Sequence, residues 1–500
     1  MRTQTIKLSV GLLTAGLLTV SACKNSEFLE VAPRSQGDAA TAYTTIDGLD
    51  GALNGVYDRL QSTALYGRDF LALAEALSDN AQATNKSGRL FNENRNVQGA
   101  TFGHWATSYF AINQANLVLD NIPNINFAVS DTARRNSLQG QAFFLRALLY
   151  HDLMRAYAYD PGVEIAAQNR GGVPIILKGV ADQTQLTYPP RASIAEVYQQ
   201  IYSDLRSALN SFSRTGNLSV ATGNRQAAQA LFSRVALYNK DYATAVQQAT
   251  DAIAGAVKIS DNGTYINGWR APRQAESIFE IQFTQPENIG VNLSLQTTYT
   301  TLVRVGDRAT TGGFGDLVPT VTSIPGSYTA FIPDLEAERS ATGQVLDIRR
   351  QLYELGTTGR GTAFIECTKF LGRNGTINLD NVPVIRASEL YLNRAEANYF
   401  LGNAAAALAD LNTIRTRCGL PARTAAELPD VALLNEILRQ RRLEFGFEGQ
   451  RWFDLKRRGL PVVKPAAQGG GLLATDFRIL APIPVNELST NRNIRQNFGY

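Results

Sequence analysis

The sequence has few of the residues on which disulfide-bonded or metal-bound folds depend. Three cysteines and two histidines occur in 500 residues, too few for a disulfide framework or a Cys/His metal cluster. The sequence leaves open whether Cys367 and Cys418 form a single bridge. Cys418 lies where a helix is expected to end at Gly419, which favours a buried thiol. We therefore expect no metal and no cofactor.

The chain also lacks a strong excess of charge. Its 48 Lys and Arg residues and 44 Asp and Glu residues give a formal net charge of +4. Removal of Arg2 and Lys7 with the leader described below lowers that charge to about +2. Proteins that bind nucleic acid carry a basic patch or stripe, which this balance does not suggest. Nucleic acid is therefore not an expected partner.

Long hydrophobic runs are absent except at the N-terminus. There, Arg2 and Lys7 precede an apolar run over residues 8–20, and Val20-Ser21-Ala22-Cys23 resembles a bacterial lipobox. The sequence predicts a signal peptide over residues 1–22, lipidation of Cys23 and an extended tether over 23–38. The alternative is an ordinary secretory signal in which Cys23 is incidental. No other stretch approaches the roughly eighteen apolar residues of a membrane-spanning helix.

What the sequence does contain is helical periodicity. Apolar residues recur at three- and four-residue spacing at Ile46, Leu49, Leu53, Val56, Tyr57 and Leu60. Further helices are expected over residues 70–77 and 105–122, with a polar loop over 80–103 between them. Trp105 opens the second of these helices and is expected to face the core.

Two regions show helical hairpins with small residues at facing positions, a pattern typical of tetratricopeptide repeats. They span residues 126–256 and 386–460. Between them, residues 257–385 are rich in Gly and Thr and contain short β-prone runs such as 277–284. We predict an all-α-dominated fold, with a single body over 39–500, a loop-rich insertion over 257–385 and a C-terminal segment over 461–500.

The C-terminal third carries recognisable motifs, among them Arg386-Ala387-Ser388-Glu389-Leu390-Tyr391-Leu392-Asn393-Arg394-Ala395-Glu396-Ala397. They continue with Ala407-Leu408-Ala409-Asp410-Leu411-Asn412, with Arg441-Arg442-Leu443-Glu444-Phe445-Gly446-Phe447-Glu448-Gly449-Gln450-Arg451-Trp452-Phe453-Asp454 and with Gln496-Asn497-Phe498-Gly499-Tyr500. These residues closely resemble the SusD/RagB family. The resemblance covers nearly the whole mature chain and is weakest over residues 80–103 and 260–380.

That resemblance implies a SusD-like helical body anchored by lipid to the outer membrane and facing the cell exterior. It also implies a partner, a SusC-like TonB-dependent transporter, to which the protein delivers an oligosaccharide. Some members of the family bind peptides instead, so a peptide ligand is the alternative within the family. Neither the transporter nor the cargo follows from periodicity or composition.

Candidate ligand-binding residues are sought in the loops, since sugar rings stack on aromatic faces and their hydroxyls pair with amides, carboxylates and guanidinium groups. The insertion and the earlier polar loop offer such residues at Trp269, Tyr299, Arg308, Phe314, Asn85, Arg89, Phe91 and Asn92. For each aromatic residue the competing interpretation is packing beneath a long loop. Asp79 and Asn80 are expected mainly to terminate a helix.

The sequence shows no recognisable catalytic site, and the protein is not expected to be an enzyme. Glu444 and Glu448 lie four residues apart, as a pair of glycosidase carboxylates might, but they belong to the scaffold motif. We expect them to pair with Arg441, Arg451 and Lys456 at helical spacing. Neither His104 nor His151 adjoins a nucleophile motif, and packed or solvent-facing roles are favoured.

Two hypotheses from other classes remain open on the sequence. A surface glycoside hydrolase would need two carboxyl groups facing each other across a cleft, roughly 5 to 10 Å apart. A tetratricopeptide scaffold for envelope assembly would bind a protein partner but no nutrient.

Overall fold

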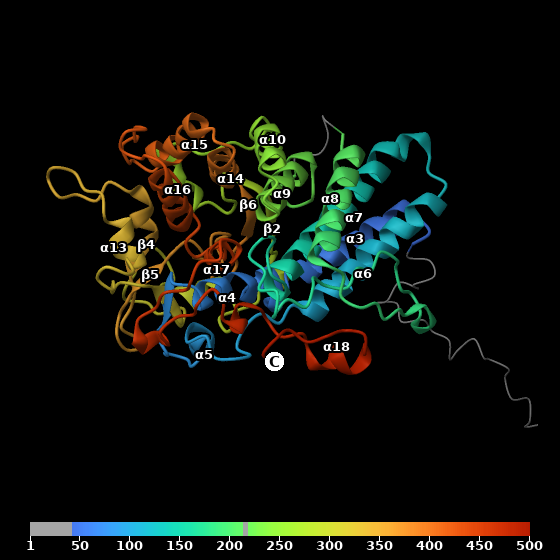
Figure 1. Ribbon diagram of the computed structural model, residues 1–500, viewed down its shortest axis with the longest axis horizontal. Helices are drawn as coiled ribbons and strands as arrows, with labels where there is room; N and C mark the ends of the chain where they lie inside the picture. Colours follow the sequence, from blue (N-terminus) through green and yellow to red (C-terminus); the bar gives the residue numbers. More distant parts are fainter. Residues whose placement is uncertain (1–42, 214–218) are drawn as a thin grey trace, which may run out of the picture.

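The computed structural model describes residues 43–213 and 219–500. The signal peptide, Cys23 and the tether predicted from the sequence lie outside these residues. Helices dominate the described chain, as predicted, and the strands are short. Figure 1 shows an elongated body with the long helices of the N-terminal half at one end and the strands β4 (Tyr353–Leu355) and β5 (Ile365–Cys367) of the insertion at the other.

The N-terminal half is built from four long helices: α3 (Ile46–Leu60), α6 (Trp105–Asn121), α7 (Thr132–Tyr157) and α8 (Ile194–Ser211). Helix α7 packs against both α6 and α8, and α3 packs on α6. Ser193 caps α8 through the backbone N–H of Glu196, whose side chain accepts from the Ser193 backbone in return. The apolar residues from Ile46 to Leu60 lie on one helix, as their spacing predicts.

Two helical hairpins form the scaffold, as the tetratricopeptide-like pattern predicts. Helix α9 (Arg225–Tyr238) pairs with α10 (Tyr242–Ile253), and α14 (Ala387–Phe400) pairs with α15 (Ala404–Arg417). Small buried residues such as Ala228 and Ala245 line the first contact, which lets the helices approach closely. Helix α10 also packs against α14, so the hairpins form one continuous layer.

Several elements lie between and beyond these helices. The polar stretch over 80–103 is not all loop, because it holds β1 (Ala81–Ala83) and α5 (Phe91–Asn94) after α4 (Asp69–Leu77). The C-terminal part contains α16 (Val431–Glu444), α17 (Arg451–Arg457) and α18 (Val485–Thr490). None of the helices within 43–213 and 219–500 combines the length and apolar character needed to cross a membrane.

The insertion holds short helices and most of the strands: α11 (Asn262–Gly268), α12 (Leu295–Tyr299), α13 (Phe331–Leu335), β2 (Ser277–Ile281), β3 (Leu317–Pro319), β4 (Tyr353–Leu355), β5 (Ile365–Cys367) and β6 (Val382–Arg386). Each strand joins a two-stranded antiparallel sheet, as β1–β3, β2–β6 or β4–β5. The β-prone run at 277–284 thus forms a strand as predicted. Because β6 runs directly into α14, the β2–β6 sheet ties the insertion to the scaffold.

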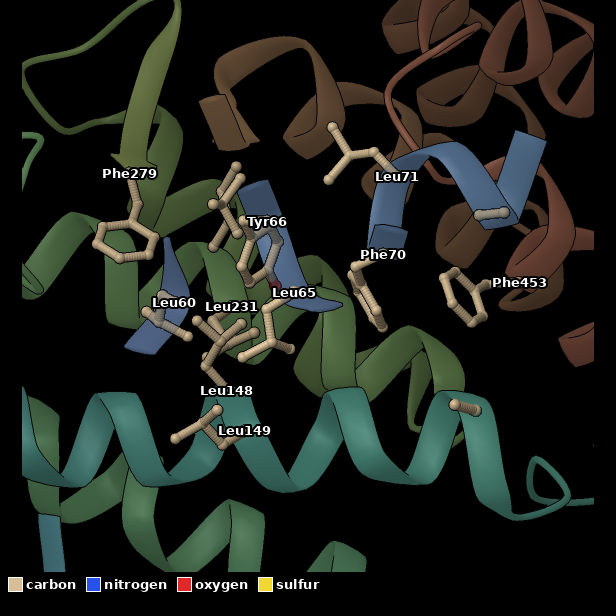
Figure 2. Packing of buried hydrophobic residues seen from close by; sticks show 14 of the residues in the cluster. Leu60, Leu65, Tyr66, Phe70, Leu71, Leu148, Leu149, Leu231, Phe279 and Phe453 are labelled. Atoms are coloured by element: carbon tan, nitrogen blue, oxygen red, sulfur yellow. The ribbon is translucent and has the colours of Figure 1, made fainter. Parts of the chain in front are cut away.

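One hydrophobic core joins the N-terminal helices to the insertion and to the C-terminal motif. Its buried members include Leu148 of α7, Leu231 of α9, Phe279 of β2 and Phe453 of α17. Figure 2 shows these side chains around Leu60, Tyr66 and Phe70, which lie at the centre of the packing. Burial on this scale supplies most of the free energy of folding.

Candidate functional site

The two loop regions singled out in the sequence lie side by side. Strand β1 pairs with β3, with Ala81 opposite Pro319. Past the end of β1, Thr84 donates from its backbone N–H to Asp316 O at 2.9 Å and from Oγ1 to Gly315 O at 2.7 Å. This pairing brings the segment containing Asn85 and Arg89 next to the segment containing Phe314.

The Phe314 ring lies against two guanidinium groups at this junction. The Arg89 guanidinium carbon is 4.3 Å from the ring centroid, and that of Arg360 is 3.9 Å from it. Asp316 fixes Arg89 through an ion pair of 2.9 Å, and Arg360 donates from Nε to Gly313 O at 2.8 Å. The Phe314 ring is only partly buried, while Arg360 is exposed.

We call Asn85, Arg89, Phe314 and Arg360 the Phe314 surface. It combines an aromatic ring with held guanidinium groups and, at Asn85, an exposed amide. Sugar binding needs this set: an apolar face for the C–H surface of a ring and polar groups for its hydroxyls.

Charged groups next to the Phe314 surface have buried side chains. Lys86 lies 3.6 Å from Glu366 and 5.3 Å from the Phe364 ring centroid. Glu366 in turn accepts from the backbone N–H of Thr301 at 2.6 Å. Burial raises the pKa of Asp316, against the hydrogen bond from Ser87 and the charge of Arg89. These contacts make the surface preorganised, which reduces the entropic cost of binding a ligand.

Three other candidates, Arg308, Asn92 and Phe91, are at least partly accessible to solvent but lie outside the Phe314 surface. Arg308 is exposed, and its Nε donates to Gly356 O at 3.3 Å. Asn92 is exposed on α5, where the partly buried Phe91 lies 5.6 Å from the Arg95 guanidinium.

Trp269 and Tyr299 do not present a ring face to solvent, contrary to the expectation of exposed loop aromatics, and this favours packing over stacking on a ligand. Both side chains are 0% exposed. Trp269 packs edge-on against Phe370 at 6.1 Å and under the ammonium group of Lys369 at 4.9 Å, and Tyr299 packs edge-on against Phe447 at 5.0 Å. They fill the space where the insertion meets the C-terminal motif, the packing role that competed with binding.

The sequence did not single out Arg360. It lies in the turn Thr358-Gly359-Arg360-Gly361, where two glycines surround one basic residue. Glycines on both sides of a charged residue are a turn signal that places the side chain on the surface. The glycines therefore predict an exposed Arg360, but they do not predict that Arg360 reaches Phe314.

The two scaffold carboxylates are structural, although their partners differ from those expected. Glu444 pairs with Arg417 at 2.7 Å and Arg386 at 3.1 Å, and Glu448 pairs with Lys369 at 2.6 Å. The expected helical partners bind elsewhere, with Arg441 on Asp454, Arg451 on Asp79 and Lys456 on Asp160. Partners from other segments replace local pairs, because these side chains are buried or, for Arg451, partly buried.

The electrostatic environment of Glu444 does not suit acid catalysis. The surrounding arginines Arg417, Arg386 and Arg349 outweigh burial and hold the pKa of Glu444 well below its usual range. A glycosidase general acid needs the opposite shift, a raised pKa. Glu444 therefore serves as an anion in a buried ion-pair cluster.

The remaining sequence candidates are also part of the packing. His104 and His151 are 0% exposed, so both take the packed role, and Trp105 is 1% exposed, as expected of a core residue. Asp79 does more than end a helix, because it holds Arg451 at 2.7 Å. Within the described ranges, no group of three or more His, Cys, Asp or Glu residues could hold a metal.

Comparison with known proteins agrees with this architecture. The model of the SusD family matches residues 362–500, and a SusD-like model, described as starch-binding and associating with the outer membrane, matches residues 27–237. The chain is thus similar to SusD-family models over these two segments. SusD-like protein P38 of Formosa agariphila is 26% identical over 98% of both chains. The starch-binding protein SusD of Bacteroides thetaiotaomicron is 34% identical over 127 residues, which cover 24% of this chain and 22% of that one.

The SusD fold extends over most of the chain. A crystal structure of a putative sugar binding protein from Bacteroides vulgatus is 27% identical and has a TM-score of 0.76. The match covers 91% of this chain and 99% of that chain. The SusD-family motifs singled out in the sequence thus lie on the scaffold hairpins and the buried ion-pair cluster, whereas the Phe314 surface lies on the loops.

Proposed function

We propose that this SusD-like protein binds an oligosaccharide at the cell surface without cleaving it, and delivers it to a SusC-like TonB-dependent transporter. The observation that carries the proposal is the Phe314 surface, where a partly exposed ring lies against the guanidinium groups of Arg89 and Arg360. The description of the family model over residues 27–237 as starch-binding supports a carbohydrate ligand.

Attachment to the outer membrane is part of the same proposal. The lipobox at Val20-Ser21-Ala22-Cys23 supplies an acyl acceptor at the start of the mature chain, and residues 23–38 serve as the tether. Several acyl chains make such an attachment stable. A protein held in this way outside the cell meets large nutrients before the transporter does.

We propose that the protein does not cleave its ligand because of the environment of its two motif carboxylates. The carboxylates of the motif, Glu444 and Glu448, are each held by basic residues and are almost fully buried. Neither can reach a glycosidic bond on the surface. The surface hydrolase is therefore the weaker candidate.

The test is a titration of the mature protein with a panel of oligosaccharides and peptides, followed by chromatography of each ligand after prolonged incubation. We expect at least one oligosaccharide to bind and to be recovered at its original length. Cleaved product would overturn the non-catalytic claim, and binding confined to peptides would overturn the carbohydrate claim. The transporter claim is tested by solubilising membranes in mild detergent. The SusC-like transporter should then purify together with the protein.

A further inference from the structure

A second feature of the insertion is a cavity of about 620 Å³ beside the end of α11. Two loops border it, one containing Arg304 and the other spanning 371–375. Its lining residues are Ile266, Asn267, Trp269, Arg270, Arg304, Val305, Leu371, Gly372, Arg373 and Gly375. The volume lies in the range of roughly 300 to 1,000 Å³ that is usual for small-ligand sites.

The charge of this cavity is one-sided. Three of its lining residues are arginines, and the lining residues, all within the described ranges, include no aspartate or glutamate. The remaining side chains are apolar or neutral. A cavity lined by charge of one sign focuses the electrostatic potential and raises the local concentration of oppositely charged ligands.

Arg373 lines this cavity and has one side-chain donor without a partner in the described chain. Its side chain is 1% exposed, and Nε donates to Asp380 Oδ1 at 3.3 Å while Nη2 donates to Asn381 O. Its Nη1 is buried and has no hydrogen-bond partner within residues 43–213 and 219–500. A buried guanidinium donor without an acceptor is costly, because desolvation is not compensated. An anion in the cavity would supply that acceptor.

The other two arginines complete the lining at different depths. Arg270 is held by Thr368, from Nη1 to the carbonyl oxygen at 2.5 Å and from Nη2 to Oγ1 at 2.9 Å. Its contact with a carboxylate is long, at 3.6 Å from Glu354, and burial lowers its pKa. Arg304 is 78% exposed at the mouth, where its Nε pairs with Asp307 at 3.0 Å. The cavity therefore has a buried, an intermediate and an exposed cationic group.

We propose that this cavity binds the negatively charged substituent of an acidic saccharide, a carboxylate or a sulfate ester. Arg373 and Arg270 bind the oxyanion, Arg304 attracts it at the mouth, and Ile266, Val305 and Leu371 contact the apolar face of the sugar. Arginine suits this role, since its planar fork pairs with carboxylate and sulfate oxygens. The inference rests on the proposed function and narrows its ligand to acidic glycans.

The test compares charged and neutral ligands of the same backbone by calorimetry. One pair is oligogalacturonate and its methyl ester, and the other is sulfated and unsulfated dextran oligosaccharide of one length. We expect at least one charged ligand to bind roughly tenfold or more tightly than its neutral partner, and the preference to shrink as salt is raised. The pair that shows the preference distinguishes carboxylate from sulfate.

Two variants assign the preference to the cavity. Arg304→Gln removes an exposed side chain and should fold normally, and Arg270→Gln removes the intermediate group. Each should weaken binding of the charged ligand several-fold to tenfold and leave the neutral ligand nearly unchanged. Arg206→Gln on α8, where the side chain is also exposed, is the matched control.

The outcomes distinguish the acidic-saccharide inference from the proposed function. Equal binding of charged and neutral oligosaccharides would overturn the acidic-saccharide inference and leave the proposed function standing. Failure of every oligosaccharide to bind would overturn both. An equal loss in the Arg206→Gln control would also overturn the inference, because it would assign the preference to diffuse surface charge.

Discussion

Arg386 donates from Nε to Glu448 Oε2 at 2.7 Å, and both side chains are almost fully buried. The same guanidinium reaches Glu276 at 2.8 Å and Glu444 at 3.1 Å. One arginine at the end of β6 thus connects the insertion, the end of α16 and the segment before α17. Arg386→Met should remove several buried ion pairs and leave carboxylates without partners, at a cost of about 3–5 kcal/mol of unfolding free energy.

Chemical denaturation followed by circular dichroism measures this loss. Arg206→Met, at an exposed position on α8, serves as the control and should change the free energy of unfolding by about 0.5 kcal/mol or less. A loss below about 1 kcal/mol for Arg386→Met would show that the cluster does not hold the insertion to the scaffold.

The helices could be predicted from the sequence because their signal is local. The apolar spacing from Ile46 to Leu60 predicts the helix that α3 forms, and the patterns within 126–256 and 386–460 predict hairpins. The short elements in the polar stretch, β1 and α5, were missed. A three-residue strand has too little periodicity to be seen, and β1 forms only because β3 lies beside it.

The Phe314 surface was predictable only in parts. Arg89 and Phe314 were each singled out as loop residues, but their contact depends on β1 pairing with a strand more than two hundred residues later. Trp269 looked like a loop aromatic because Asn267 and Gly268 precede it. Its burial is set by Lys369 and Phe370, about a hundred residues away, and no local pattern reveals that.

Acidification should weaken the fold through the buried histidines. His104 lies among Phe70, Phe102 and Tyr157, and burial lowers its pKa to about 3. It stays neutral in the folded state, while in the unfolded state it takes up a proton below pH 6.5. The unfolding free energy should therefore fall by about 1.4 kcal/mol per pH unit as pH drops from 6.5 toward 3 on account of this histidine.

Replacing His104 with phenylalanine isolates this contribution. Urea denaturation at pH 7.5 and pH 5 should show a loss on acidification that is about 2 kcal/mol smaller for His104→Phe than for the unsubstituted protein. Comparing the two pH values within each protein removes the cost of the substitution itself. The same pH dependence in both proteins would refute the assignment.

The two cysteines of the described chain are free and buried, so the bridge left open by the sequence does not form. Burial raises the pKa of both Cys367 and Cys418 to about 12. Since the thiolate is the reactive form, both should react slowly with a thiol reagent at pH 8. In a Cys23→Ser protein, we expect little labelling in the native state and two labelled thiols after denaturation without reductant. Rapid native labelling, or no labelling after denaturation, would contradict this.

The central claim is that the Phe314 surface binds an oligosaccharide, and the most direct measurement is calorimetric titration of Phe314→Ala with the oligosaccharide that the unsubstituted protein binds. Phe110→Ala is the matched control, because Phe110 is 64% exposed on α6 and has no place in the surface. Loss of the stacking face should weaken binding roughly tenfold or more, with little change in melting temperature and no effect of Phe110→Ala. Unchanged affinity in a folded Phe314→Ala protein would contradict the account.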